Sequence, residues 1–104
     1  MGLFGKKVKY YEHEIKEVKL ERLSTDDSEI KNLADNLVNS IPILIDFSHL
    51  DEDSSNKAAA FLSGVAYALL GDYYKIGKQV YLFVDEVANN YNSVKRYLHE
   101  KEIL

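Results

Sequence analysis

The fold of this chain is decided by residues 41–84, which read IPILIDFSHLDEDSSNKAAAFLSGVAYALLGDYYKIGKQVYLFV. The run from Ile41 to Phe47 is short, mostly apolar and rich in β-branched residues, so it predicts a strand buried on both faces. A polar, acidic stretch then leads into a helix predicted over about residues 51–70. The segments 73–76 and 79–84 flank a tight turn at Gly77-Lys78 and predict a hairpin.

The predicted helix over residues 51–70 is apolar on nearly all of its sides. Such a helix must be buried on more than one side, and a chain of 104 residues with one sheet offers little to cover the second side. Ala60, Gly64 and Ala68 recur every four residues and form one smooth face. Two interpretations of this face stay open, namely packing on the chain's own sheet and a contact between subunits. Gly71 follows the helix and is expected to be its left-handed cap.

The flanking sequence extends this centre to the order β-α-β-α-β-β-α. A strand is predicted over about residues 16–23, and a helix capped by Ser24 or Thr25 is predicted to run to about Asn39. Asn89-Asn90 is a break, and a final short helix follows it. The predicted fold class is α/β: a two-layer sandwich of two helices on a small mixed sheet, with a short C-terminal helix.

Composition limits the classes of function. The net charge of −4 argues against a general nucleic-acid binder, and the lack of cysteine excludes a cysteine nucleophile or a cysteine zinc site. No apolar run approaches the ~20 residues that span a bilayer, and residues 1–8 lack the apolar core of a secretory signal, so a cytoplasmic protein is expected. We expect a flexible tail over residues 1–14, a globular domain over 15–88 and a helical extension over 89–104.

The sequence contains no recognisable catalytic motif, and no cofactor is expected. The spacing Asp46-x-x-His49-x-Asp51 offers only one histidine, which is too few for a convincing metal site, and acids before a helix usually stabilise its dipole. The N-terminal residues leave two interpretations open: a soluble disordered tail, or a weak contact with an anionic membrane surface. The contact would use two apolar anchors and two nearby lysines, namely Leu3, Phe4, Lys6 and Lys7.

Several consecutive motifs resemble the signature of the SepF family of bacterial cell-division proteins. They are the helical run FLSGVAYAL over 61–69, Gly71-Asp72, the KIG motif at 75–77 and the strand YLFV over 81–84, preceded by the strand ILIDF over 43–47. The resemblance is good over residues 41–84 and loose over 16–40. The sequence departs from the family pattern at Leu70, usually Gly or a small polar residue, at Tyr73-Tyr74 and at Val84-Asp85. The family's long linker between its N-terminal amphipathic helix and its globular domain is almost absent.

This resemblance implies a non-enzymatic scaffold at the division site, one that forms dimers or larger polymers and binds the C-terminal tail of the tubulin-like protein FtsZ. Lys75 and Tyr81 match positions that help to bind this tail, although Lys75 could be merely solvated and Tyr81 could be a core residue. The subunit contact is expected at Ala60, Phe61, Gly64 and Ala68. Two alternatives stay open: a self-assembling structural protein without FtsZ binding, and a small ligand-binding or enzymatic ferredoxin-like domain.

Overall fold

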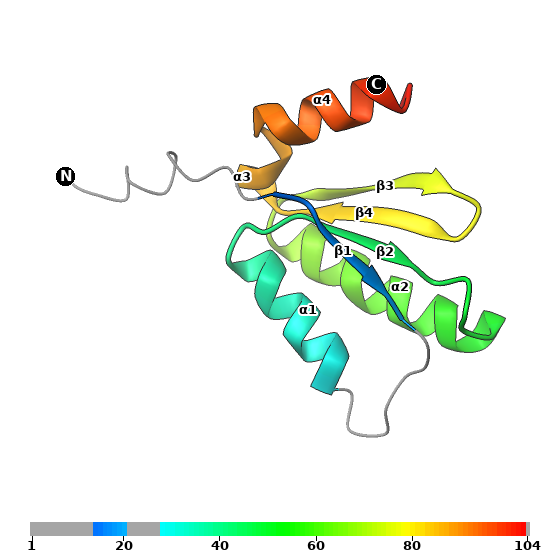
Figure 1. Cartoon of the computed structure of the whole chain (residues 1–104). Helices are drawn as coiled ribbons and strands as arrows, with labels where there is room; N and C mark the ends of the chain where they lie inside the picture. The colour runs from blue at the N-terminus through cyan, green and yellow to red at the C-terminus, as the bar shows by residue number, and fades with distance from the viewer. Residues whose placement is uncertain (1–13, 21–27, 104) are drawn as a thin grey trace.

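The architecture comes from a computed structural model that describes residues 14–20 and 28–103. The elements follow one another as β1 (Lys16–Lys19), α1 (Ser28–Val38), β2 (Ile43–Asp46), α2 (Glu52–Ala68), β3 (Asp72–Gly77), β4 (Val80–Val84), α3 (Glu86–Asn89) and α4 (Asn92–Glu100) (Figure 1). The strands of the described residues form one sheet in the order β1-β2-β4-β3. β1 pairs with β2 in parallel, and the other pairs are antiparallel. The predicted α/β fold with a mixed sheet is confirmed.

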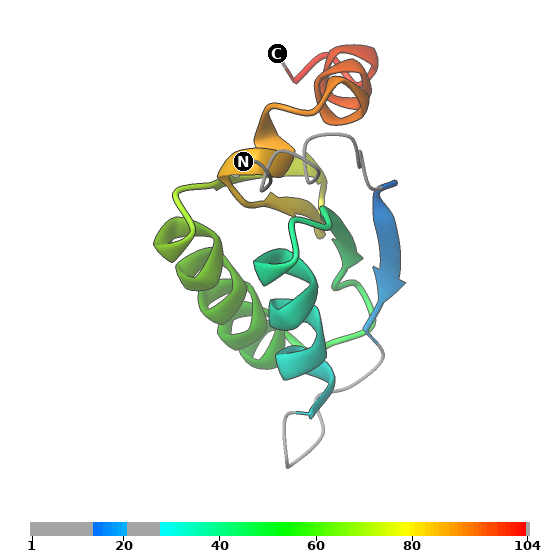
Figure 2. The same ribbon diagram turned by 90° about the vertical axis from the view of Figure 1, so that its left-hand side faces the viewer.

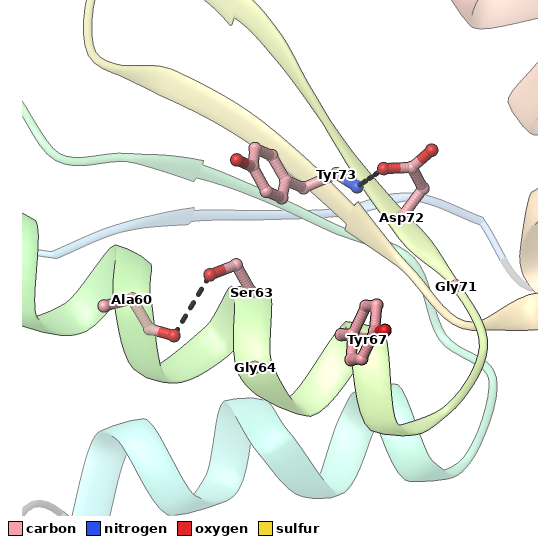
Figure 3. A pocket seen from close by; sticks show the side chains of 7 residues that line it. All are labelled: Ala60, Ser63, Gly64, Tyr67, Gly71, Asp72 and Tyr73. Atoms are coloured by element: carbon pink, nitrogen blue, oxygen red, sulfur yellow. Dashed lines mark hydrogen bonds between the residues drawn. The ribbon is translucent and has the colours of Figure 1, made fainter.

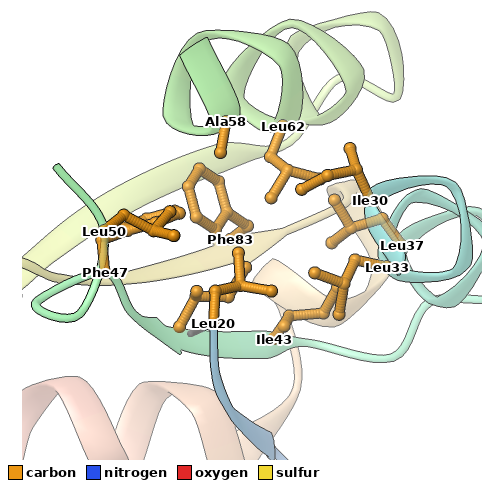
Figure 4. Close-up of a cluster of buried hydrophobic side chains, with 11 residues drawn as sticks. Leu20, Ile30, Leu33, Leu37, Ile43, Phe47, Leu50, Ala58, Leu62 and Phe83 are labelled. Atoms are coloured by element: carbon orange, nitrogen blue, oxygen red, sulfur yellow. The ribbon is translucent and has the colours of Figure 1, made fainter. Parts of the chain in front are cut away.

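Helices α1 and α2 cover one face of the sheet, and the main core lies between the two layers (Figures 2 and 4). Its buried side chains are Leu20, Ile30, Leu33, Leu37, Ile43, Ile45, Phe47, Leu50, Ala58, Leu62 and Phe83. The opposite face carries a second cluster, in which β4 packs against α3 and α4 through Leu82, Val84, Ala88, Tyr91, Val94 and Leu98. Ile43 and Ile45 are buried in the first cluster, whereas Leu44 packs against the second and is only half-buried, so the predicted burial of this strand is complete on one face and partial on the other.

The ends of the helices and strands show which boundaries the local sequence can predict. Asp51 caps α2 by accepting a hydrogen bond from the Ser54 backbone N–H at 2.7 Å. The expected caps Ser24 and Thr25, and the last part of the expected first strand, lie outside the described residues. Helix α3 was not predicted, because a single turn has no apolar periodicity. Its N-cap is Asp85, whose buried carboxylate accepts hydrogen bonds from Ala88 N at 2.7 Å and from Ser40 Oγ at 2.6 Å.

The end of α2 corrects one expectation. The left-handed residue is Leu70, with φ of 59°, and no glycine in the described chain has positive φ. Leu70 N donates to Tyr67 O at 3.0 Å and Gly71 N donates to Ala66 O at 2.8 Å, which is the bonding pattern of a Schellman cap. Gly71 is required for another reason. A Cβ atom at this position would lie 1.9 Å from the Val84 carbonyl oxygen, so only glycine lets the two backbones approach.

Replacement of Leu70 by glycine is expected to stabilise the protein by ~1 kcal/mol, because the left-handed conformation of this residue is costly for leucine and not for glycine. The Leu70 side chain is 72% exposed, so its removal sacrifices little packing. Urea unfolding followed by circular dichroism measures the change. Leu70→Ala is the matched control, since it removes the same side chain but keeps the backbone cost. Equal stability of the two variants would contradict the explanation.

Candidate functional site

A surface groove runs between α2 and β3, and we call it the α2–β3 groove (Figure 3). It consists of two adjoining hollows of about 340 and 200 Å³ that share Ala60, Ser63 and Tyr73. The first extends along α2 to Gly64 and Tyr67, and the second reaches Tyr81 and Phe83 of β4. The groove exists because α2 presents alanine, serine and glycine to this side, and such small side chains do not fill the space beside the strand.

The sheet side of the groove is aromatic. Tyr73 pairs with Phe83 and Lys75 pairs with Tyr81 across β3 and β4, and residues two apart on a strand share a face. The ring centroid of Tyr81 lies 6.2 Å from those of Tyr73 and Phe83, and 5.9 Å from that of Phe47. Tyr73 is the most exposed aromatic residue of the sheet side at 49%.

The structure brings the two predicted tail-binding residues together. Lys75 and Tyr81 are direct cross-strand partners, and the Lys75 side chain is exposed. Tyr81 is partly buried and packs against the main core while it also lines the groove. Tyr81 therefore packs on the core, as one interpretation expected, and also forms part of the groove wall.

The residues expected at a subunit contact all lie on the exposed side of α2. Ala60, Phe61, Gly64 and Ala68 are exposed, whereas Ala58, Leu62 and Ala66 face the core. Phe61 is 47% exposed, and a Cβ built on Gly64 meets no atom of the described chain within 4 Å. This face is therefore not packed on the chain's own sheet, and nothing within the described residues explains a glycine in the middle of the helix.

Sequence reasoning missed two aromatic residues of the groove, Tyr67 and Tyr73. Tyr73 lies two positions before Lys75 on the same strand, so the period of a strand could have placed both on one face. Tyr67 is 82% exposed at the C-terminal end of α2, and local sequence could not distinguish it from a core residue of an apolar helix. Leu3, Phe4, Lys6 and Lys7 lie outside the described residues.

The acidic residues before α2 have local roles in the structure. Two hydrogen bonds from Ser48 lower the pKa of Asp46. The one from the Ser48 side chain has the larger effect and the one from its backbone the smaller. The Ser54 backbone N–H likewise lowers the pKa of Asp51, the cap of α2. Within residues 14–20 and 28–103, no group of three His, Cys, Asp or Glu side chains could hold a metal ion. None of the described helices is long and apolar enough to cross a bilayer.

These features define an α/β domain whose mixed sheet carries α1 and α2 on one face and α3 and α4 against part of the other, with an open groove that has an aromatic wall. Residues 18–86 match the family model described as cell division protein SepF. The chain belongs to the SepF family, as the motifs between residues 41 and 84 had indicated.

Its relatives include three proteins named cell division protein SepF. The one from Lactobacillus delbrueckii subsp. bulgaricus is 31% identical over 77 residues, which cover 74% of this chain and 52% of the relative. Those from Oceanobacillus iheyensis and Pelotomaculum thermopropionicum are 29% and 32% identical over 75 residues, 72% of this chain and 52% and 50% of the relatives. The chain thus spans about half the length of the curated relatives it matches.

Proposed function

We propose that this chain is a cell-division scaffold that dimerises through the exposed face of α2 and binds the C-terminal tail of FtsZ in the α2–β3 groove. Membership of a family whose relatives are named cell division proteins supports the division role. The observation that carries tail binding is the direct pairing of the exposed Lys75 with Tyr81, a residue that lines the open groove. Contact of Leu3, Phe4, Lys6 and Lys7 with an anionic membrane is part of the same proposal.

The groove suits a short peptide with acidic and apolar residues, which is the character that the family resemblance implies for the tail. Lys75 offers an exposed ammonium group to a carboxylate, and the rings of Tyr73 and Tyr81 offer apolar area at low entropic cost. Both wall tyrosines lie on strands that are paired with each other, so the platform is ordered before the peptide arrives. Such preorganisation lowers the cost of capturing a flexible chain.

The exposed face of α2 supports the dimer. Gly64 costs helix stability and packs against nothing in the described chain, while Phe61 presents a large apolar side chain close by. A second subunit on this face would bury Phe61, and the absence of a side chain at Gly64 would let the two helices approach closely. The same second subunit would lie next to the groove, because Ala60 and Gly64 also line it.

A dimer without tail binding is the second candidate, favoured by the same exposed apolar face of α2. The two candidates differ in what fills the α2–β3 groove: an FtsZ tail in the first, and side chains of the second subunit in the other. A titration with the tail peptide therefore distinguishes them.

The third class, a small ligand-binding domain, requires several polar groups that converge in a pocket. Here the lining is mainly alanine, glycine and aromatic residues, with Ser63 and Asp72 as the polar members.

Lys75→Glu is expected to weaken binding of the host FtsZ tail peptide about tenfold or more, because it reverses the charge that faces the acidic residues of the peptide. Isothermal titration calorimetry measures the affinity, and circular dichroism checks the fold. Lys78→Glu is the matched control, since it makes the same charge change in the exposed turn of the same hairpin and should bind nearly as wild type does. Equal losses in both variants would point to a general charge effect instead of a site at Lys75.

A further inference from the structure

Strand β3 lies at an edge of the sheet formed by the described residues, and it also forms one wall of the α2–β3 groove. The register of the sheet shows which of its backbone groups face outward. Phe47 N donates to Gln79 O at 2.8 Å, and antiparallel strands exchange hydrogen bonds at every second pair. Tyr81 and Phe83 of β4, two and four residues after Gln79, therefore bond with β2, which leaves Leu82 and Val84 to bond with β3.

The partners of Leu82 and Val84 on β3 are Tyr74 and Asp72, so these two residues direct their backbone groups toward β4. Tyr73 and Lys75 direct theirs away from the sheet. An independent hydrogen bond agrees with this assignment, because the Tyr73 N–H donates to the Asp72 carboxylate at 2.8 Å instead of to β4 (Figure 3). Among the hydrogen bonds of the described chain outside its helices and strands, none involves the Lys75 N–H or the Tyr73 and Lys75 carbonyl groups.

Tyr73 lines a groove whose opposite wall includes small residues, and Lys75 follows on the same edge of β3, paired with the groove residue Tyr81. Ala60, Ser63 and Gly64 leave space beside the strand, and an extended peptide directs every second side chain to the same face. Main-chain hydrogen bonds to a free sheet edge provide affinity, and alternate side chains provide specificity, in the mode known as strand addition. Lys75 lies on this edge and carries the charge that an acidic peptide needs.

We propose that the partner tail binds as an added strand along the outer edge of β3, with alternate apolar side chains resting on Ala59 and Ser63 of α2, which line the groove and lie outside the proposed subunit contact. This inference rests on the proposed function, since it says how the same tail occupies the same groove. Lys75 supplies a backbone N–H and C=O to the added strand, and Tyr73 supplies a C=O. The Tyr73 N–H already donates to the Asp72 carboxylate, so Lys75 is the residue of β3 that both donates to and accepts from the added strand.

The test is a series of host FtsZ tail peptides, each with one backbone nitrogen methylated, titrated against the full chain by calorimetry. Because only alternate N–H groups of an added strand face β3, methylation should weaken binding about tenfold at every second central position and leave the positions between nearly unchanged. An unmodified peptide that binds, combined with methylation effects that do not alternate, would overturn strand addition and leave the proposed function standing. An unmodified peptide that does not bind overturns both.

Amide hydrogen exchange followed by NMR gives a second readout on the protein. Adding the unmodified peptide should slow exchange at the Lys75 N–H at least tenfold, because this group gains a partner. The Tyr74 N–H is the internal control, since it already faces β4 and should change little. The Lys75 N–H could instead be protected without peptide, and its exchange could become slower still as the protein concentration is raised. That result would show that a second copy pairs along β3 and would overturn the proposal.

Discussion

Replacement of Gly71 by alanine is expected to lower the free energy of unfolding by at least ~3 kcal/mol, a large part of the stability of a domain of this size. The new Cβ atom would lie 1.9 Å from the Val84 carbonyl oxygen and 2.6 Å from the Asp85 Cα. Both are backbone atoms, so no side chain can rotate to make room. The junction of β4 with α3 would have to move away from the end of α2, and Glu86 N would lose its 3.2 Å hydrogen bond to Leu69 O.

Chemical denaturation followed by circular dichroism measures this loss. Gly77→Ala is the matched control, because its Cβ would meet only side-chain atoms of Val80, the nearest at 3.6 Å, which is ordinary contact. The control should change stability by no more than about 1 kcal/mol. If both substitutions have equal effects, the close approach at Gly71 does not limit stability, and glycine is present there for another reason.

Gly64→Lys is expected to convert a dimer into a monomer, because it places a long charged side chain at the centre of the proposed contact between α2 helices. Burial of an unpaired charge is among the costliest changes that an interface can suffer. The Lys side chain has open space around it in the single chain, since a Cβ at Gly64 meets no described atom within 4 Å. The variant should therefore remain folded while it loses its partner.

Size-exclusion chromatography with light scattering at tens of micromolar protein decides the outcome. Asn92→Lys introduces the same side chain at an exposed position of α4 and should leave the dimer intact. Gly64→Ala adds a third comparison: it should raise the stability of the helix by ~1 kcal/mol and weaken the dimer if the two helices are in close contact. A wild-type protein that is already a monomer would refute the proposed assembly.

The parts of the fold that were predictable depend on local pattern. The apolar run over residues 41–47 encodes a strand with contacts on both faces, and Gly77-Lys78 marks the hairpin between β3 and β4. The cap of α2 was misassigned because the need for glycine at position 71 comes from a backbone 13 residues further along, at Val84. Local sequence contains no sign of that approach, so the left-handed cap was expected at Gly71 instead of at its neighbour Leu70.

The candidate site was predictable only in part for a similar reason. The family motifs suggested Lys75 and Tyr81 as binding residues, but the groove also needs the small residues of α2 to lie opposite β3, which is a property of packing. An apolar helix does not reveal which of its sides faces the sheet and which stays exposed. Tyr67 and Tyr73 therefore became visible as groove residues only when the two elements were placed side by side.

The strand order has a consequence for how the chain folds during synthesis. The central pairings of the sheet are made by β4, which is the last strand in the chain, and it lies between β2 and β3. Before residues 80–84 are available, β3 has no neighbour in the sheet and β2 can pair only with β1. The sheet beneath α2 is therefore completed in one late step. Until then the partly synthesised chain exposes apolar surfaces of β2 and α2.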